Sequence, residues 1–333
     1  MTAATFAGGA LLLSRREVRA LMAPADWLAA AVTAFAAAAG GRGHAAPPMH
    51  VDGEGGVFHA KGARLDLDRR YVAVKVNGNF PGNPAGRGLP TIQGAILLCD
   101  GSDGRLLAIL DSIEVTLRRT AAATALAARH LARPDSETLL VCGCGEQGAA
   151  HVAALRHVLP LRRVFAWDRD PAHAEALARG VEGIEAAAVA DLGGAALTSD
   201  AIVTCTTARE PFLSTDVVRP GTFVAAVGAD NPDKNEIGAD LMAKARVVAD
   251  STEQCAAMGD LRHAIAAGAM RREDVHAELA DIVAGAKPGR DRSDEIVLFD
   301  STGTALQDVA AAAMIHERAS GRADVHRVAV GAA

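Results

Sequence analysis

Three glycines, Gly143, Gly145 and Gly148, are the residues whose spacing most clearly indicates a chemical function. They follow the apolar run 139–142 and precede a helix-like segment, 149–155. In such a strand–turn–helix context the first glycine makes a tight turn, the second lets a pyrophosphate approach the backbone, and the third allows close helix–strand packing. The helix N-terminus offers N–H groups and a positive dipole end to phosphates. The spacing therefore predicts a dinucleotide-binding turn; the alternative is a glycine turn without a cofactor.

An acidic residue follows these glycines at the distance expected for such a turn. The short apolar segment 164–167 ends in Asp168, about 20 residues beyond the last glycine. A carboxylate here binds the two ribose hydroxyls and repels a 2′-phosphate, which favours NAD over NADP. The adjacent Arg169 can accommodate that phosphate, so NADP stays open as the less favoured alternative.

The composition limits the class of protein. The 333 residues are enough for two domains, each with its own core. The net charge of −6, without a basic stripe interleaved with aromatic residues, argues against a nucleic-acid partner. The apolar runs are too short for a membrane span, and segment 11–13 is too short for a signal-peptide core. We therefore expect a cytoplasmic protein without a membrane partner.

The cysteines point in the same direction. The five cysteines are scattered and odd in number, as expected for reduced thiols in a cytoplasmic protein. Cys142 and Cys144 lie one residue apart inside the glycine loop, which leaves no closed tetrahedral site, so we expect no bound metal.

A lysine in a strand is a second candidate for chemistry. Lys75 lies among alternating apolar residues in segment 71–77. Burying an ammonium group is costly unless it is paired, so one interpretation is an edge strand with Lys75 pointing to solvent. The other is a lysine facing a cleft, where partial burial tunes its pKa for proton transfer or for polarising a carboxylate.

Two further groups have similar potential. Asp230 follows the apolar run 223–226, at the carboxyl end of a predicted parallel strand, where open α/β sheets bind ligands. It is a candidate acid/base, or a turn residue whose side chain bonds its own backbone. Arg119, beside Arg118 and Thr120, can hold a substrate carboxylate with two parallel hydrogen bonds. The alternative is a solvated helix face, which suits Arg118 better.

The predicted elements place these residues on two kinds of sheet. In the N-terminal part, Ser14 and Glu17 form a capping box ahead of a helix, and a second helix ends at 40–41. The Gly- and Pro-rich segment 41–56 is predicted to be a loop. Strands are predicted at 57–60, at 71–77, and in a hairpin of 91–99 with 106–110, followed by a helix over about 114–132. The result is a mixed sheet with helices.

The C-terminal part has the pattern of a Rossmann-type doubly wound parallel sheet in an α/β protein. Helical patterns separate regularly spaced apolar runs. The predicted strands are 138–142, 163–167, 201–205, 222–227, 246–249 and 296–299, and a last helix is predicted over 302–318.

The chain resembles the ornithine cyclodeaminase/mu-crystallin family over nearly its full length. Six motifs in the same order carry the resemblance: 74–77 with Pro81 and Asn83; 88–94; Leu117 with 119–122; Gly143, Gly145 and Gln147; 228–230 with Pro232, Lys234 and Glu236; and 299–301 with Gly303, Ala305, Leu306 and Asp308. The resemblance implies a substrate-binding and dimerisation domain over 1–119, completed by about 302–333, and an NAD-binding domain over 120–301. It also implies a homodimer.

The resemblance implies roles for individual residues. Lys75 is similar to the lysine that binds the substrate carboxylate and assists proton transfer, and Arg119 to its arginine partner, close to the cofactor. Asp230 is similar to the aspartate that exchanges protons with the substrate amine, and Thr302 to a substrate-side residue. The candidate cofactor-binding residues are Thr91, Arg119, Thr120, Gly143, Gly145, Glu146, Gln147, Gly148, Asp168, Arg169, Thr206, Val227, Gly228, Lys234 and Ser301.

One region departs from the family pattern. Ornithine cyclodeaminases carry an arginine before the first sheet strands and a glutamate shortly after it. This chain has His59 and Lys61 near the place of that acid, and Glu54 precedes the strand. His59 and Lys61 thus become substrate-binding candidates, and a substrate with a distal ammonium group is disfavoured relative to another or a more acidic amino acid.

The implied activity is NAD-dependent hydride transfer at Cα of an L-amino or imino acid. The first interpretation is an ornithine cyclodeaminase-like enzyme that yields a cyclic amino acid and ammonia. The alternative is a net imino-acid (ketimine) reductase or amino-acid dehydrogenase. A third is a nucleotide-binding protein without catalysis, against which the joint presence of Lys75, Arg119 and Asp230 argues.

Overall fold

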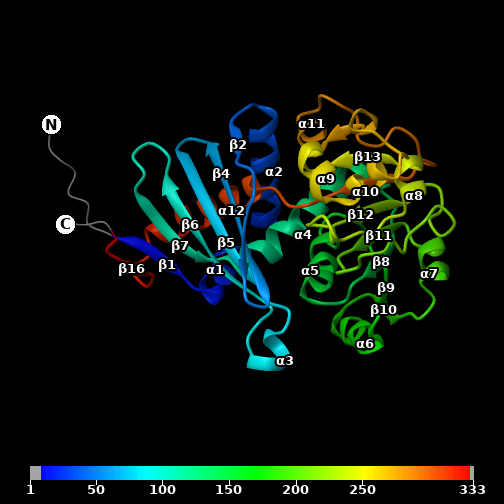
Figure 1. The fold of residues 1–333 in the computed structure, drawn as a ribbon, viewed down its shortest axis with the longest axis horizontal. Helices are drawn as coiled ribbons and strands as arrows, with labels where there is room; N and C mark the ends of the chain where they lie inside the picture. The colour runs from blue at the N-terminus through cyan, green and yellow to red at the C-terminus, as the bar shows by residue number, and fades with distance from the viewer. Residues whose placement is uncertain (1–8, 331–333) are drawn as a thin grey trace. The chain divides into compact units, whose positions relative to one another are not determined.

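The computed structural model describes residues 9–330, which form two compact units (Figure 1). Unit 1 extends to Arg119 and resumes at Thr304, and unit 2 is Thr120–Gly303. Each unit contains a sheet that has eight strands within the described residues.

Unit 1 is a mixed sheet covered by helices. Its strands are β1 (Ala10–Leu13), β2 (Gly43–Ala45), β3 (Met49–Gly53), β4 (Gly56–Asp66), β5 (Arg70–Asn79), β6 (Ile92–Asp100), β7 (Leu106–Asp111) and β16 (His326–Val328). Its helices are α1 (Arg15–Leu21), α2 (Pro24–Ala39), α3 (Asn83–Arg87), α12 (Ala305–Ser320) and the first part of α4 (Ser112–Leu131). The strand order is β16-β1-β7-β6-β5-β4-β2, with β3 also paired to β4.

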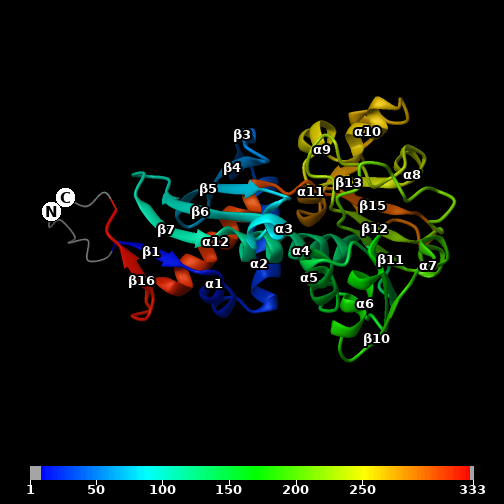
Figure 2. The ribbon, with the colours of Figure 1, turned by 60° about the horizontal axis from the view of Figure 1, so that its bottom comes forward.

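The packing of unit 1 follows from the alternation of its strands. Along β5, Tyr71, Ala73 and Lys75 are buried, whereas Val74 and Val76 on the other face are exposed. Helix α12 packs against β4, β5 and β6 and against α2 (Figure 2). One face of the sheet is therefore the core, and the other face carries exposed apolar side chains.

The structure confirms part of the sequence interpretation of this unit and corrects part. The predicted capping box is present, because Glu17 accepts a hydrogen bond from the Ser14 backbone at 2.8 Å. The prediction of a loop over 41–56 is wrong, since β2 and β3 pair with β4, which itself continues to Asp66. Pro47 and Pro48 lie in the connection between β2 and β3, and glycine only weakens a strand, so their abundance did not exclude strands here.

Unit 2 is an all-parallel doubly wound sheet. Its strands are β8 (Thr138–Cys142), β9 (Arg163–Trp167), β10 (Glu185–Ala188), β11 (Ala201–Thr204), β12 (Phe223–Ala226), β13 (Arg246–Ala249), β14 (Ala277–Glu278) and β15 (Val297–Asp300). Its helices are the rest of α4, α5 (Glu146–Leu155), α6 (Pro171–Gly180), α7 (Leu192–Thr198), α8 (Ala239–Lys244), α9 (Thr252–Met258), α10 (Asp260–Ala266), η1 (Arg272–Asp274) and α11 (Leu279–Val283).

The strand order of unit 2 locates a ligand-binding edge. The order is β10-β9-β8-β11-β12-β15-β13-β14, so the chain reverses its direction of travel across the sheet between β8 and β11. In open α/β sheets the crevice for ligands lies beyond the carboxyl ends of strands at such a switch point. The Gly143 loop follows β8 and Thr206 follows β11, which places both at this edge. The predicted doubly wound sheet is confirmed.

No single helix within residues 9–330 has both the length and the hydropathy needed to cross a membrane; α1 and α2 meet that test only as a pair, bent by 89° at their junction.

Candidate functional site

The predicted residues of unit 1 form a buried charge cluster around an aspartate. The Lys75 Nζ lies 2.8 Å from Asp308 Oδ2, and Arg119 Nε donates to Asp308 Oδ1 at 3.1 Å. Lys75 also donates to the Thr116 hydroxyl at 3.3 Å, and Arg119 Nη1 to the Gln307 amide oxygen at 3.2 Å. Lys75 and Arg119, both predicted as site residues, thus share one carboxylate to which the sequence analysis assigned no role.

Three elements bring this cluster together. Lys75 lies on β5, which is flanked by β4 and β6, so the interpretation as a solvent-pointing edge-strand lysine is wrong. Its side chain points to the core face, like Tyr71 and Ala73. Arg119 comes from α4 and Asp308 from the first turn of α12. Arg118, by contrast, is half-exposed and pairs with Glu114 one helical turn away, as the solvated-face interpretation suggested.

Burial and charge together set the protonation of the cluster. Burial lowers the pKa of Lys75 to about 8; Asp308 opposes this shift, and Arg119 and Lys61 add to it. Burial acts to raise the pKa of Asp308, but Lys75 and Arg119 outweigh it and the net direction is downward. The lysine can therefore exchange a proton near neutral pH while the aspartate stays ionised, which suits general acid–base catalysis.

His59 and Lys61 lie on the same face as Lys75. In the antiparallel β4–β5 pair, Lys61 is directly opposite Lys75 and His59 is opposite Asn77. Residues directly opposite each other point to the same side of the sheet. His50 on β3 is opposite His59, and their rings meet edge-to-face at 4.7 Å. Two positions that depart from the family pattern are thus placed near the lysine by register alone.

The glycine loop of unit 2 has the geometry that its sequence predicts. Gly143 has φ +98°, the left-handed region that favours glycine. A Cβ on Gly148 would lie 2.3 Å from the Gly143 carbonyl oxygen, so this close contact of helix α5 with the turn requires glycine. A Cβ on Gly145 would meet nothing within 4 Å, which leaves open space at the N-cap of α5. This loop can accept a pyrophosphate.

Asp168 is tied to the same loop. Its Oδ2 accepts the Cys144 N–H at 2.7 Å and its Oδ1 accepts the Asp170 N–H at 3.0 Å. The adjacent Arg169 is exposed. The carboxylate therefore lies directly beside the glycine turn, where a ribose bound at β9 would present its hydroxyls.

A set of buried carboxylates, to which the sequence interpretation assigned no role, holds the loops at the carboxyl edge. Glu236 accepts the Thr206 N–H and hydroxyl, both at 2.7 Å, and the Gly228 N–H at 2.8 Å. Asp260 accepts the Glu236 N–H at 2.7 Å. Burial raises the pKa of Glu236, of Asp260 and of Asp300, that of Asp300 to about 7. Thr206 and Gly228, two predicted cofactor positions, are thereby fixed to one side chain.

The remaining predicted residues of unit 2 lie on loops at strand ends. Asp230 pairs with Lys234 at 2.7 Å, and its side chain is 54% exposed. Ser301 donates to Asp250 at 3.0 Å, and Thr302 accepts from the Gln254 amide at 2.7 Å. Among the other predicted residues, Thr120 is buried, Val227 and Gln147 are half-buried, Glu146 is exposed, and Thr91 in unit 1 is half-buried.

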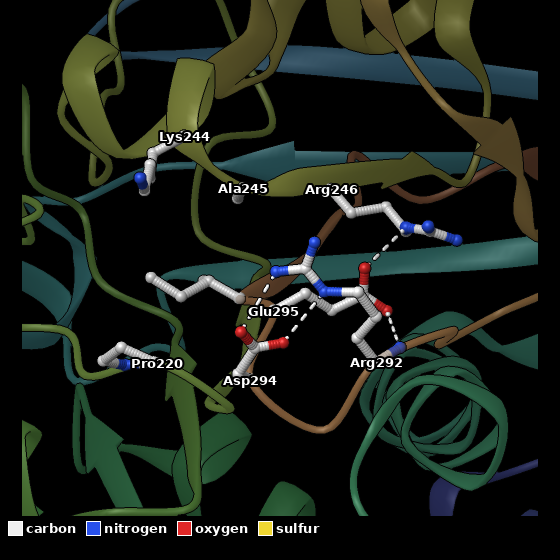
Figure 3. A pocket seen from close by; sticks show the side chains of 8 residues that line it. Pro220, Lys244, Ala245, Arg246, Arg292, Asp294 and Glu295 are labelled. Carbon is white, nitrogen blue, oxygen red and sulfur yellow. Dashed lines mark hydrogen bonds and ion pairs between the residues drawn. The ribbon is translucent and has the colours of Figure 1, made fainter.

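A separate cavity of about 410 Å³ opens at the amino ends of the unit 2 strands, opposite the glycine loop. It is lined by Pro220, Lys244, Ala245, Arg246, Arg292, Asp294, Glu295 and Ile296. Figure 3 shows two ion pairs among these residues, Arg246 with Glu295 and Arg292 with Asp294. These pairs stabilise the loop before β15, and this edge is not the one where parallel sheets bind ligands.

Comparison with known proteins identifies the family. The model of the ornithine cyclodeaminase/mu-crystallin family matches residues 10–323. An alanine dehydrogenase of Archaeoglobus fulgidus is 35% identical over 93% of this chain and 95% of its own. A Δ1-pyrroline-2-carboxylate reductase of Paracoccus denitrificans is 44% identical over 71% of this chain and 76% of its own.

Solved structures agree. An archaeal alanine dehydrogenase dimer with bound NAD has a TM-score of 0.91 and 34% identity, covering 96% of this chain and 98% of its own. Thermococcus litoralis Δ1-pyrroline-2-carboxylate reductase, in complex with NADH and L-proline, has a TM-score of 0.91 and 31% identity over 96% and 100%. Paracoccus denitrificans iminosuccinate reductase with NAD⁺ has a TM-score of 0.89 and 30% identity over 97% and 100%. The resemblance seen in the sequence is confirmed: the chain belongs to the ornithine cyclodeaminase/mu-crystallin family of enzymes.

Proposed function

We propose that this protein is an NAD-dependent oxidoreductase that interconverts the C=N bond of an imino acid and the CH–NH group of an L-amino acid. The observation that carries the proposal is the buried Lys75–Asp308–Arg119 cluster, with its two cations on one carboxylate at 2.8 Å and 3.1 Å. A protein that only binds a nucleotide has no need for a buried lysine whose pKa is lowered to about 8.

The residues of unit 2 fit NAD as the cofactor. The open space at Gly145 admits a pyrophosphate, and Asp168 offers a carboxylate to a ribose. This carboxylate favours NAD over NADP, despite the exposed Arg169. When bound, the cofactor supplies or accepts the hydride. The residues proposed to hold it are Thr91, Arg119, Thr120, Gly143, Gly145, Glu146, Gln147, Gly148, Asp168, Arg169, Thr206, Val227, Gly228, Lys234 and Ser301.

The residues of unit 1 bind and protonate the substrate. Arg119 and Lys75 hold the substrate carboxylate, which fixes the orientation of Cα. Lys75 donates a proton to the nitrogen during reduction and accepts one during oxidation. Asp308 keeps both cations in place and stays ionised because Lys75 and Arg119 lower its pKa despite its burial. Asp230 is proposed to exchange protons with the substrate amine, and Thr302 is proposed as a substrate-binding residue.

A net reductase is the favoured direction, and a cyclodeaminase is the second candidate. Two positive or neutral side chains, Lys61 and His59, lie on the face that carries Lys75, which disfavours a substrate with a distal ammonium group. Asp230 favours the second candidate, because its exposed carboxylate beside Lys234 is suited to exchanging protons with an amine.

A panel assay distinguishes the two candidates. The purified protein is mixed with trace NAD and L-ornithine, L-lysine or L-alanine, and separately with NADH and a cyclic or an ammonia-derived imine. We expect NADH to be consumed one-for-one with the imine. Ammonia in large excess over NAD, without lasting NADH, would establish the cyclodeaminase instead. Replacing Lys75 with alanine should abolish turnover and leave NAD binding nearly intact; an equal loss of NAD binding would contradict its proposed role.

We also propose a homodimer that buries the exposed face of the unit 1 sheet. Val74 and Leu97 are direct cross-strand partners on this face, and both are 39% exposed. Val76 and Phe58, which lie on the same face, are 40% and 42% exposed. A continuous apolar patch of this kind is typical of a protein interface, and a second copy of the chain is its proposed occupant, by analogy with the archaeal alanine dehydrogenase dimer.

We propose that the protein is cytoplasmic. All five cysteines are free thiols, as a reducing compartment requires, and three of them are buried. We propose no nucleic-acid or membrane partner, in line with the net charge of −6.

A further inference from the structure

We propose that the substrate carries a second carboxylate and that Lys61 binds it, so that the enzyme acts on an imino or amino dicarboxylate. This inference rests on the proposed function, and it names the substrate class of the same site. Lys75 and Arg119 hold the first carboxylate, next to the reacting carbon, and Lys61 holds the distal one.

The register of the sheet puts Lys61 beside the first carboxylate site. Lys61 on β4 pairs directly with Lys75 on β5 in an antiparallel ladder. Directly opposite side chains lie on one face, with Cβ atoms about 4.5–5.5 Å apart. The two lysine side chains therefore extend from adjacent positions on one face, where a short dicarboxylate can contact both. The burial of Ala63 and Leu65, two and four residues along β4, shows that this is the core face.

The charges in this part of unit 1 fit such a substrate. Asp308 is already bonded to both Lys75 and Arg119, at 2.8 Å and 3.1 Å. Lys61 acts electrostatically on both members of the Lys75–Asp308 pair, because its charge lowers the pKa of each. Lys61 thus adds a third positive charge beside the Lys75–Arg119 pair. Its charge attracts a second substrate carboxylate and repels a distal ammonium group.

The neighbouring histidines extend the same surface. His59 is two residues from Lys61 on the same face, and its ring meets His50 at 4.7 Å. Neutral imidazoles donate hydrogen bonds, and protonated ones add positive charge, so both states favour an anion here. The face beside Lys75 is therefore polar and cationic where a hydrophobic substrate would need apolar contacts.

The reaction balances without another reactant. The C=N double bond of the imino dicarboxylate is reduced by the hydride of NADH, which forms the Cα–H bond. Lys75 gives the proton that forms the N–H bond, and solvent reprotonates the lysine. The products are NAD⁺ and an L-amino dicarboxylate; Lys61 exchanges no proton and only holds the distal carboxylate.

The test compares substrates that differ in the distal group. Oxaloacetate, 2-oxoglutarate and pyruvate are each supplied with ammonia and NADH, alongside a cyclic imine with one carboxylate. We expect kcat/KM to be highest for a dicarboxylate, by 10-fold or more, since a hydrogen bond between charged groups contributes about 1.5–3 kcal/mol. Succinate, which cannot react, should inhibit competitively and more strongly than acetate.

Variants of β4 assign the effect to Lys61. Lys61→Met should lower the dicarboxylate-to-monocarboxylate ratio of kcat/KM by about 10- to 100-fold, mainly through KM, and should weaken succinate inhibition. Lys61→Arg should restore much of both. Arg64→Met is the matched control, because Arg64 lies on the same strand, pairs with Asp66 and points to the other face.

Two results would overturn the inference. One is a wild-type enzyme that turns over monocarboxylate imines as efficiently as dicarboxylates; the proposed oxidoreductase function would then stand and the substrate class would fall. The other is a ratio that Lys61→Met leaves unchanged in a variant with normal NAD binding and folding. Failure to reduce any imine would instead refute the proposed function, and the inference with it.

Discussion

Replacing Asp308 with asparagine tests whether Lys75 is the group that exchanges protons with the substrate. The Asp308 side chain is 2% exposed and is bonded to both Lys75 and Arg119. Asparagine has nearly the same shape and no charge, so the change removes an electrostatic partner without opening a cavity. Burial lowers the pKa of Lys75 to about 8 and Asp308 opposes that shift. Without the carboxylate, Lys75 should lose its proton at lower pH.

The size of the shift follows from Coulomb's law. Two unit charges about 4 Å apart attract by about 4 kcal/mol at an effective dielectric constant of about 20. One pH unit corresponds to about 1.4 kcal/mol. The midpoint of the lysine titration should therefore move by as much as about 3 pH units. For reduction Lys75 must be protonated, so wild-type kcat/KM should fall as the pH rises through about 8. For oxidation it must be neutral, so that rate should rise through the same pH.

The assay follows nicotinamide absorbance in both directions over the pH range in which each protein is folded. In Asp308→Asn both midpoints should move to lower pH, and the reductive rate at neutral pH should fall by about 100-fold, the effect of about 2.7 kcal/mol. Asp308→Glu keeps the charge and should keep the midpoints near those of the wild type. Asp324→Asn removes an exposed carboxylate, 67% exposed and paired with Arg322, and should change neither.

Loss of the fold must be separated from loss of the proton. Breaking a buried ion pair costs about 3–5 kcal/mol of stability, and neutralisation of Lys75 offsets part of it. Urea unfolding of each variant measures this cost directly. An Asp308→Asn enzyme that is folded and active with unchanged pH midpoints would refute the assignment of the titrating group to Lys75.

Three other predictions concern the cofactor loop, the buried acids and the dimer. Gly148→Ala should lower both thermal stability and NAD affinity, because its Cβ would lie 2.3 Å from the Gly143 carbonyl oxygen. Gly145→Ala, whose Cβ would meet nothing within 4 Å, should lower NAD affinity alone. The prediction would be contradicted if the two variants had the same melting temperature and the same NAD affinity. Burial raises the pKa of Asp300 to about 7, so the folded state binds more protons than the unfolded state, and stability should fall as the pH rises from about 4 to 7; Asp300→Asn should flatten that slope in urea titrations. Val74→Asp should convert the proposed dimer to a monomer in sedimentation, while Leu197→Asp, at an exposed position of unit 2, should not.

The parallel sheet of unit 2 was predictable because its strands are buried on both faces. Such strands appear in the sequence as short continuous apolar runs. The runs 138–142, 163–167 and 246–249 coincide with β8, β9 and β13, and the other three predicted strands differ from the structure by one residue at one or both ends. β10 and β14 were missed, because one is an Ala-rich run and the other has two residues. Neither carries the apolar signal on which the prediction depended.

The sequence analysis assigned roles to the cations of the candidate site, but none to the carboxylates that hold them. A lysine among alternating apolar residues is unusual, and a short stretch of sequence is enough to recognise it. Asp308 lies in the first turn of a helix, where acids are common, and is 189 residues from Arg119. Glu236, Asp260 and Asp300 likewise look like ordinary loop or helix-end acids. Their roles come from burial and from hydrogen bonds between distant segments, which no local pattern contains.

The position where β4 ends decides which side chains share the substrate face of unit 1. The sequence analysis predicted that end too early. A strand over 57–60 leaves Lys61 outside the ladder, as a loop residue without a fixed direction. In the structure β4 continues to Asp66, which fixes the pairing of Lys61 with Lys75 and of His59 with Asn77. In a ladder with a period of two residues, that extension decides which side chains share the face of the catalytic lysine. The departure from the family pattern therefore adds positive charge to this face, beside a carboxylate site. The enzyme should select for negative charge at the distal end of its substrate.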